Sequence, residues 1–145
     1  MKRFQIIFLL LVFCYEGYSQ QNPPDLIKKF FDTYQKDSDK AIDDIYTTNP
    51  WASEISEAIA DMKKTVGSYS ETMGKFYGTD LITLQKCTER FQLYVYLARY
   101  DRQPMRVTFE FYKPDDKWII YSLNFDSGID EDLEEAAKQA IQKPK

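Results

Sequence analysis

The residues of this chain best suited to binding chemistry are tyrosines that alternate with apolar residues in its second half. Tyr94, Tyr96 and Tyr112 each carry a hydrogen-bonding hydroxyl on a large apolar ring, a combination that suits a half-wetted surface. Arg106 and Glu110 belong to the same alternation. On a strand they favour cross-strand ion pairs, and the alternative is an anion-binding arginine held by a carboxylate. Together these residues form the candidate ligand- or partner-binding set.

The chain contains no histidine, and this excludes whole classes of catalytic site. Nucleophilic sites with an imidazole base are ruled out, as are zinc, copper and non-haem iron sites built on imidazole. Proton transfer near neutral pH would need a carboxylate, tyrosine or lysine with a shifted pKa. We therefore favour a non-catalytic binding or interaction module. An isomerase or dehydratase that uses tyrosine and carboxylate groups is the alternative.

No motif predicts a metal ion or a cofactor. The acidic run from Asp126 to Asp132 has the wrong spacing for a calcium loop of the EF-hand type, whose twelfth position would be Ala137 instead of glutamate. Acidic residues are expected at the start of a helix in any case. The net charge of −4, with no block of basic residues, argues against nucleic acid and anionic lipid as partners.

Residues 1–19 have the pattern of a secretory signal peptide. Lys2 and Arg3 form the basic start, and the small residues Gly17 and Ser19 form a cleavage site. The apolar run Phe4–Phe13 is about ten residues long, whereas roughly 20 are needed to span a bilayer. We therefore expect cleavage rather than a membrane anchor.

Cleavage after Ser19 would leave residues 20–145 as one periplasmic or secreted domain without an integral membrane segment. Cys14 would leave with the signal peptide, and the bulky Phe13 before it argues against lipoprotein processing. Cys87 then remains alone, so that no intrachain disulfide is expected. We expect Cys87 to be a small buried apolar residue.

The first half of the mature chain has the periodicity of helices. Prolines after Asn22 can start a helix whose apolar stripe runs through Leu26–Tyr34. Ser38 is predicted to cap a second short helix. A third is predicted from Asn49 to the stop signal at Gly67. Its apolar stripe is Trp51, Ile55, Ile59, Met62 and Val66.

After Gly67 the apolar period becomes two, which predicts an antiparallel meander. The stretch 68–88 is predicted to be extended, and turns are predicted at 101–104 and 113–116. The facing of the last strand, 118–125, stays open, because loops of four and five residues put opposite residues on the core side. A short charged helix is predicted over 133–141.

The alternation predicts two different sheet faces. An aliphatic face is expected to pack against the helices and comprises Phe91, Leu93, Val95, Leu97, Met105, Val107, Phe109 and Phe111. The opposite face comprises Tyr94, Tyr96, Tyr100, Arg106, Thr108, Glu110 and Tyr112. Three uses of this tyrosine face remain open: an ordinary solvent-facing surface, a homodimer surface, or a ligand groove.

Helices that precede a contiguous antiparallel meander define the α+β class. This plan resembles the nuclear-transport-factor-2-like (SnoaL-like) superfamily in its long first helix, Leu26–Tyr34, and in the charged turn before Trp118 that leads to a terminal strand ending at Phe125. The resemblance implies a cone of N-terminal helices on a curved meander, with a short C-terminal helix.

The resemblance also implies a pocket between helices and sheet, which would suit a small amphipathic guest, and frequent pairing of two copies through the sheet. The superfamily includes isomerases, dehydratases, transport factors and plain ligand-binding modules. The resemblance therefore implies a fold more than an activity.

Overall fold

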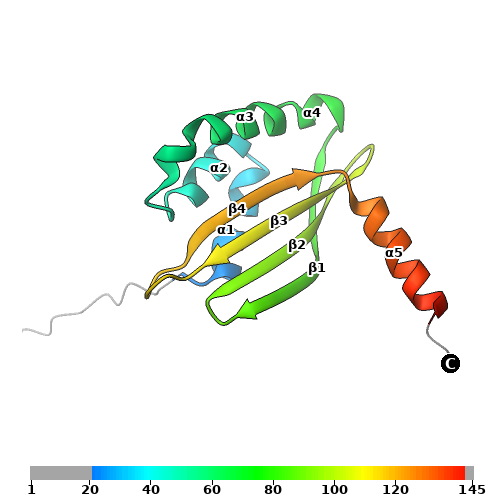
Figure 1. Cartoon of the computed structure of the whole chain (residues 1–145). Helices are drawn as coiled ribbons and strands as arrows, with labels where there is room; N and C mark the ends of the chain where they lie inside the picture. Colours follow the sequence, from blue (N-terminus) through cyan, green and yellow to red (C-terminus); the bar gives the residue numbers. More distant parts are fainter. Residues whose placement is uncertain (1–20, 143–145) are drawn as a thin grey trace, which may run out of the picture.

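The computed structural model describes residues 21–142 and has the predicted α+β class, with helices before an antiparallel sheet and a last helix after it (Figure 1). The predicted signal peptide lies outside the described residues. No helix within residues 21–142 has the length and apolar character needed to cross a membrane. In chain order the elements are α1 (Pro23–Tyr34), α2 (Ser38–Tyr46), the 3₁₀ turn η1 (Ala52–Ile55), α3 (Ser56–Gly67), α4 (Tyr69–Thr72), β1 (Phe76–Thr88), β2 (Phe91–Tyr100), β3 (Pro104–Tyr112), β4 (Ile119–Asp126) and α5 (Ile129–Gln142).

The first two helices begin at side-chain caps. Asn22 Oδ1 accepts a hydrogen bond from the Asp25 N–H at 3.0 Å, so that α1 starts where the prolines predict. At the start of α2 the capping residue is Asp37, whose Oδ1 accepts from the Lys40 N–H at 2.8 Å. The predicted cap at Ser38 is therefore wrong by one position.

The predicted third helix is divided, and much of its apolar stripe stays uncovered. Trp51 and Ile55 are 65% and 41% exposed, and Val66 is the buried residue of α3. Asn49 explains the interruption. Its Nδ2 donates to the Ile120 carbonyl at 2.9 Å and its Oδ1 accepts from the Trp51 N–H at 2.9 Å. The chain is thereby tied to β4 before α3 can begin.

The stretch predicted to be extended from residue 68 begins instead with the single turn α4. This turn places Tyr69 and Met73 on one side, and both are buried. Arg102 donates to the Glu71 and Thr72 carbonyls at 3.4 and 2.9 Å. The end of the turn is therefore capped from the β2–β3 hairpin, a partner that is remote in sequence.

The strands form the predicted meander in the order β1-β2-β3-β4. Register shifts interrupt β1 at Tyr77, Ile82 and Cys87, the first beside Gly78, whose φ is 117°. Such bulges bend a strand and blunt an exposed sheet edge. Helices α1–α4 lie on one side of the sheet (Figure 1). We call that side the inner face and the opposite side the outer face.

Strand β2 turns its tyrosines toward the helices, so that its predicted facing is wrong. Tyr94 lies opposite Phe109, and Tyr96 lies opposite Val107; Phe109 and Val107 are fully buried. The outer face therefore carries the β2 residues that were expected in the core, namely Phe91, Leu93, Val95 and Leu97.

The parity of the hairpin explains the error. Arg99 pairs with Pro104, and an even number of residues lies between them. Even-numbered residues of β2 therefore share a face with odd-numbered residues of β3. The predicted aliphatic face assumed odd positions on both strands. The facing of β3 is correct, because its inner residues Met105, Val107, Phe109 and Phe111 are all buried.

In strand β4 both an even-numbered and an odd-numbered residue point toward the core. Ser122 pairs with Glu110 and Ile120 with Phe111, which leaves Tyr121 in a bulge. Ile120 and Leu123 are consequently both buried. The bulge settles the facing that the sequence leaves open.

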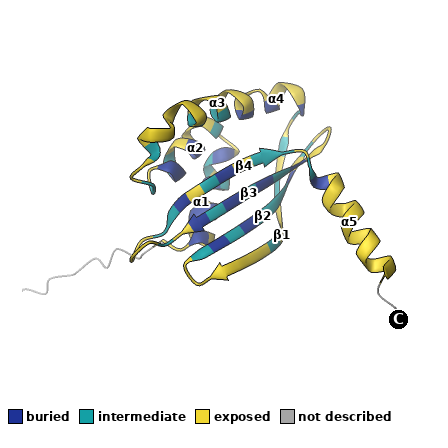
Figure 2. Cartoon of the chain, in the orientation of Figure 1, coloured by how far each residue is buried: buried dark blue, intermediate teal, exposed yellow. Residues whose placement is uncertain are grey.

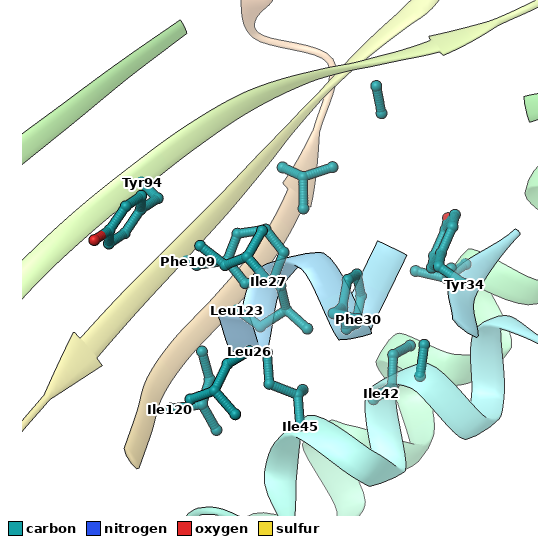
Figure 3. Packing of buried hydrophobic residues seen from close by; sticks show 14 of the residues in the cluster. Leu26, Ile27, Phe30, Tyr34, Ile42, Ile45, Tyr94, Phe109, Ile120 and Leu123 are labelled. Atoms are coloured by element: carbon teal, nitrogen blue, oxygen red, sulfur yellow. The ribbon is translucent and has the colours of Figure 1, made fainter. Parts of the chain in front are cut away.

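The core lies between α1, α2 and the inner faces of β3 and β4 (Figures 2 and 3). The Phe30 ring meets the Phe109 ring edge-to-face with centroids 5.2 Å apart, and Ile27 and Ile42 are fully buried beside them. Each such side chain stabilises the fold by roughly 1.5–3 kcal/mol before entropy is subtracted. By contrast, β1 and α5 are largely exposed (Figure 2).

Candidate functional site

The predicted binding residues do not form one site, because the sheet divides them between its faces. Tyr94 and Tyr96 lie on the inner face, whereas Arg106, Glu110 and Tyr112 lie on the outer face. The predicted single tyrosine face is therefore wrong.

The two inner tyrosines are part of the core. Tyr94 Oη donates to Gln92 Oε1 at 2.9 Å, and both residues are buried. The Tyr96 ring packs edge-to-face on Phe31, with centroids 5.3 Å apart. Burial raises the pKa of both phenols. Tyr94 therefore belongs to the core, and Tyr96 packs against α1 at its edge.

The outer face carries a row of half-buried apolar residues on β2 beside two exposed tyrosines, and we call these residues the outer patch. Phe91 lies at one end of this patch. Its ring centroid is 5.6 Å from that of Tyr121 and 6.3 Å from that of Tyr112, and both contacts are edge-to-face. Tyr121 is 60% exposed. The outer patch consists of Phe91, Leu93, Val95 and Leu97 from β2, Tyr112 from β3 and Tyr121 from β4.

Charged groups border the outer patch. Arg106, directly opposite Leu97, pairs with Asp126 at 2.9 Å and with Asp132 at 2.6 Å. The carboxylates of Asp132 and Asp126 raise the pKa of its guanidinium. Its pairing with Asp126 is the predicted cross-strand ion pair, and the anion-binding alternative loses support because two carboxylates already hold the arginine. Glu110, opposite Leu93, makes no ion pair within residues 21–142.

Aromatic side chains fill the centre of the space between helices and sheet. Phe31 packs edge-to-face on Phe109 with centroids 5.5 Å apart, beside the Phe30–Phe109 contact described above. Tyr34 stacks on Phe125 at 5.8 Å. The pocket that the family resemblance implies for this position is therefore occupied by the protein's own rings.

An open hollow remains at the rim of this layer, between the ends of α1 and α3 and the start of β1. Its volume is about 370 Å³, and Tyr34, Tyr69, Phe76 and Tyr100 contribute to its wall. Tyr34 Oη and Tyr100 Oη share a hydrogen bond of 2.6 Å. Burial is the main reason that the pKa of each phenol is raised. Its aromatic wall makes this hollow a candidate small-molecule site.

For the isomerase alternative, the decisive feature within residues 21–142 is a buried acid. An isomerase that uses tyrosine and a carboxyl group needs the acid inside an apolar cavity. Among residues 21–142 Gln92 is the buried polar side chain, and no aspartate or glutamate is buried. In the same range no cluster of carboxylate and thiol groups could hold a metal ion.

Cys87 is exposed, which corrects the expectation of a buried residue. It occupies the bulge between Lys86 and Thr88 at the edge of the sheet. A bulge residue has no opposite partner, and the edge position leaves its other side open to solvent.

Comparison of the chain with protein-family models, curated proteins and solved structures finds no match. The role of the outer patch therefore has to follow from its own geometry. The sequence does not indicate that Tyr121 belongs to this surface, because the β4 bulge that exposes it has no glycine or other local signal. Nor does it indicate the Tyr34–Tyr100 pair, whose members lie 66 positions apart.

Proposed function

We propose that this protein is a non-catalytic interaction module that works in the periplasm or outside the cell and binds a protein partner through the outer patch. The proposal depends on one contrast. Between α1, α2 and strands β3 and β4 the inner face is filled by the protein's own aromatic rings, whereas the outer face presents Tyr112 and Tyr121, 41% and 60% exposed, beside four half-buried apolar residues of β2.

The composition of the outer patch supports protein binding. Apolar and aromatic side chains gathered on one face of a small domain are typical of an interaction site. Aromatic residues, tyrosine above all, are enriched at protein interfaces because they bury much area with few rotatable bonds. Phe91, Tyr112 and Tyr121 provide such an anchor cluster, and Arg106 and Glu110 provide a polar rim.

The cellular address and the finer fold belong to the same proposal. The signal-peptide pattern of residues 1–19 supports export. The order of helices before a meander supports a cone of the nuclear-transport-factor-2-like kind, reduced here to four strands. In that superfamily the sheet is a frequent meeting place for subunits, which agrees with binding through the outer patch.

A photo-reactive side chain tests the proposal in native cells. Benzoylphenylalanine in place of Tyr121 is expected to form a covalent product with a protein partner upon irradiation. The same substitution at Trp51, an equally exposed aromatic residue on the helical side, is expected to form none. Val95→Glu in the Tyr121 variant should abolish the product. Absence of a product from Tyr121, or equal products from both positions, would contradict binding through the outer patch.

A small amphipathic ligand in the open hollow is the second candidate. Tyr34 and Tyr100 share one hydrogen bond, so that one of the two hydroxyls keeps an unused proton to donate to a ligand. Native mass spectrometry of the exported protein would reveal a ligand as a discrete added mass. Tyr100→Phe should remove that mass, and Tyr121→Phe should leave it in place.

A further inference from the structure

Strand β1 carries open apolar side chains on the inner face of the sheet. Leu81 lies opposite Tyr96 of β2. Leu84 lies opposite Tyr94, so that both leucines share the inner face with these tyrosines. They are nevertheless 53% and 40% exposed, and Figure 2 shows β1 exposed along most of its length. We call Leu81, Leu84, Tyr94 and Tyr96 the inner shelf.

The inner shelf continues the core toward the edge of the sheet. On its core side, Phe31 of α1 packs edge-to-face on Tyr96, with ring centroids 5.3 Å apart. Tyr94 meets Phe111 edge-to-face at 6.2 Å. On its other side the two leucines are open to solvent. Apolar side chains left open beside a packed core mark a place where another element can bind.

Gln92 provides a polar group at one end of the inner shelf. It is 7% exposed and lies on the inner face, two residues from Tyr94. Gln92 Oε1 accepts the Tyr94 hydroxyl at 2.9 Å, but its Nε2 has no hydrogen-bond partner among residues 21–142. Since no fully covered side-chain nitrogen or oxygen in that range lacks a partner, this amide must reach the surface. A largely buried amide with a free donor can receive an acceptor from another molecule.

The shape of this edge argues against two kinds of occupant. Register shifts at Tyr77, Ile82 and Cys87 leave regular pairing only over 78–81 and 83–86. An added strand depends on regular backbone hydrogen bonds, which bulges disrupt. A small molecule is also a poor fit, because its binding site usually buries most of it, whereas Leu81 is more than half exposed.

A helix matches the inner shelf, because a helix packs through its side chains and needs no backbone pairing. From Tyr96 to Gln92 the shelf extends about 13 Å along β2. A helix covers this distance with about nine residues, enough for apolar anchors on three successive turns. Helices α1–α4 belong to the packed part of this chain, and α5 begins after β4, the opposite edge strand from β1. The covering helix therefore has to come from another molecule.

We infer that the inner shelf docks an amphipathic helix of another protein, which brings a hydrogen-bond acceptor to Gln92 Nε2. The apolar side of that helix covers Leu81 and Leu84 and continues the helical layer beyond α1. The acceptor is a polar side chain or one of the free carbonyls at the C-terminal end of the helix. This surface lies on the opposite side of the sheet from the outer patch and does not depend on the proposed function.

Benzoylphenylalanine in place of Leu84 tests the docking in native cells. Irradiation is expected to give a covalent product with another protein, and the same substitution at Trp51 should give none. Leu81→Glu should lower the yield from Leu84 at least tenfold. The matched control Leu133→Glu, at an exposed leucine of α5, should leave the yield unchanged. No product, a product of two identical chains, or a product that survives Leu81→Glu would overturn the inference.

A second probe, at Leu81, distinguishes a helix from a strand. The two leucines face residues of β2 that are two apart, which is about 7 Å along the sheet. This distance corresponds to four or five residues of a helix at about 1.5 Å each, but to about two residues of a strand. Peptide mapping is therefore expected to find the two attachment sites three to five residues apart on the partner. Sites two residues apart would mean an added strand and would refute the helix.

Gln92→Glu tests the hydrogen bond, because it keeps an acceptor for Tyr94 and removes the Nε2 donor. The yield from the Leu84 probe should fall by up to about tenfold, which is the usual effect of losing one hydrogen bond. An undiminished yield would contradict the assigned role of Gln92. The product from Tyr121 should be unaffected by this change, because that probe lies on the outer face. Failure at Leu84 with a product at Tyr121 overturns this inference alone and leaves the proposed function standing.

Discussion

Tyr34 and Tyr100 meet at the boundary between α1 and the sheet, and their hydroxyls have no other hydrogen-bond partner among the described residues. Aromatic contacts surround them: Tyr34 meets Phe76 edge-to-face at 5.3 Å, and Tyr69 meets Tyr100 at 6.2 Å. The charged form of either phenol would lie in this apolar setting, which is why burial raises the pKa of Tyr34. The pair therefore links stability to pH.

Stability should fall at alkaline pH, and Tyr34→Phe should weaken that dependence. The unfolded phenol ionises near its ordinary value of 10.0, whereas the folded one stays protonated beyond it. Above that pH the unfolded state binds fewer protons, so that the free energy of unfolding drops by up to about 1.4 kcal/mol per pH unit for this group. Below pH 10 the Tyr34 phenol is protonated in both states, and its full contribution to the free energy of unfolding is present.

Urea unfolding at pH 8 and pH 11 measures the effect. At pH 8 Tyr34→Phe should cost about 1 kcal/mol, the value of the shared hydrogen bond. At pH 11 the difference from wild type should shrink or reverse. Tyr121→Phe, at an exposed position, is the control and should follow wild type at both values. If the free energy of unfolding of Tyr34→Phe is below that of wild type by the same amount at both pH values, the link between this phenol and alkaline stability is contradicted.

At the scale of single elements, the start of α2 gives a sharp prediction because two adjacent residues are both good caps. Asp37→Ala should cost about 1 kcal/mol, since its carboxylate accepts the Lys40 N–H. Ser38→Ala should be nearly neutral, and Asp37→Asn should recover most of the loss. Thermal unfolding of the three variants checks this, and a larger loss from Ser38→Ala would return the cap to the position predicted from sequence.

Strand β3 gives a second prediction, because its two faces differ so clearly. Val107 is fully buried, so that Val107→Asp places an unpaired charge in the core and should prevent folding or cost several kcal/mol. Thr108 lies on the outer face opposite Val95 and Asn124, and Thr108→Asp should cost far less. Circular dichroism and urea midpoints distinguish the two, and similar losses would contradict the facing of β3.

The comparison of β2 with β3 shows what sequence patterns can and cannot predict. Alternation correctly identifies both strands and both turns, because it is a local property. The face depends on the parity of the hairpin that pairs Arg99 with Pro104, and no residue type marks it. Hydrophobicity misleads here, since Tyr94 is buried beside a hydrogen-bond partner while the more apolar Val95 lies on the outer face.

For the whole molecule, the class and the order of elements follow from sequence, and the functional surface does not. Helical and strand periods predict α1, α2 and the meander, but the β4 bulge at Tyr121 and the short α4 depend on contacts remote in sequence. The bulge decides that Tyr121 reaches the outer patch. The candidate site is thus a product of sheet register, and only Arg106, Glu110 and Tyr112 of the predicted set lie on or beside it.

The proposed export leads to a prediction about the mass and the thiol content of the mature chain. Cleavage after Ser19 would remove Cys14 and leave Cys87 as the one thiol of the mature protein. Because Cys87 is exposed in the edge strand β1, it should react with iodoacetamide without denaturant. Intact-mass spectrometry of the exported protein should show a chain that begins at Gln20 and carries one label. Lipoprotein processing would instead give a chain that begins at a lipid-modified Cys14, and an exported chain that retains Met1 would contradict cleavage.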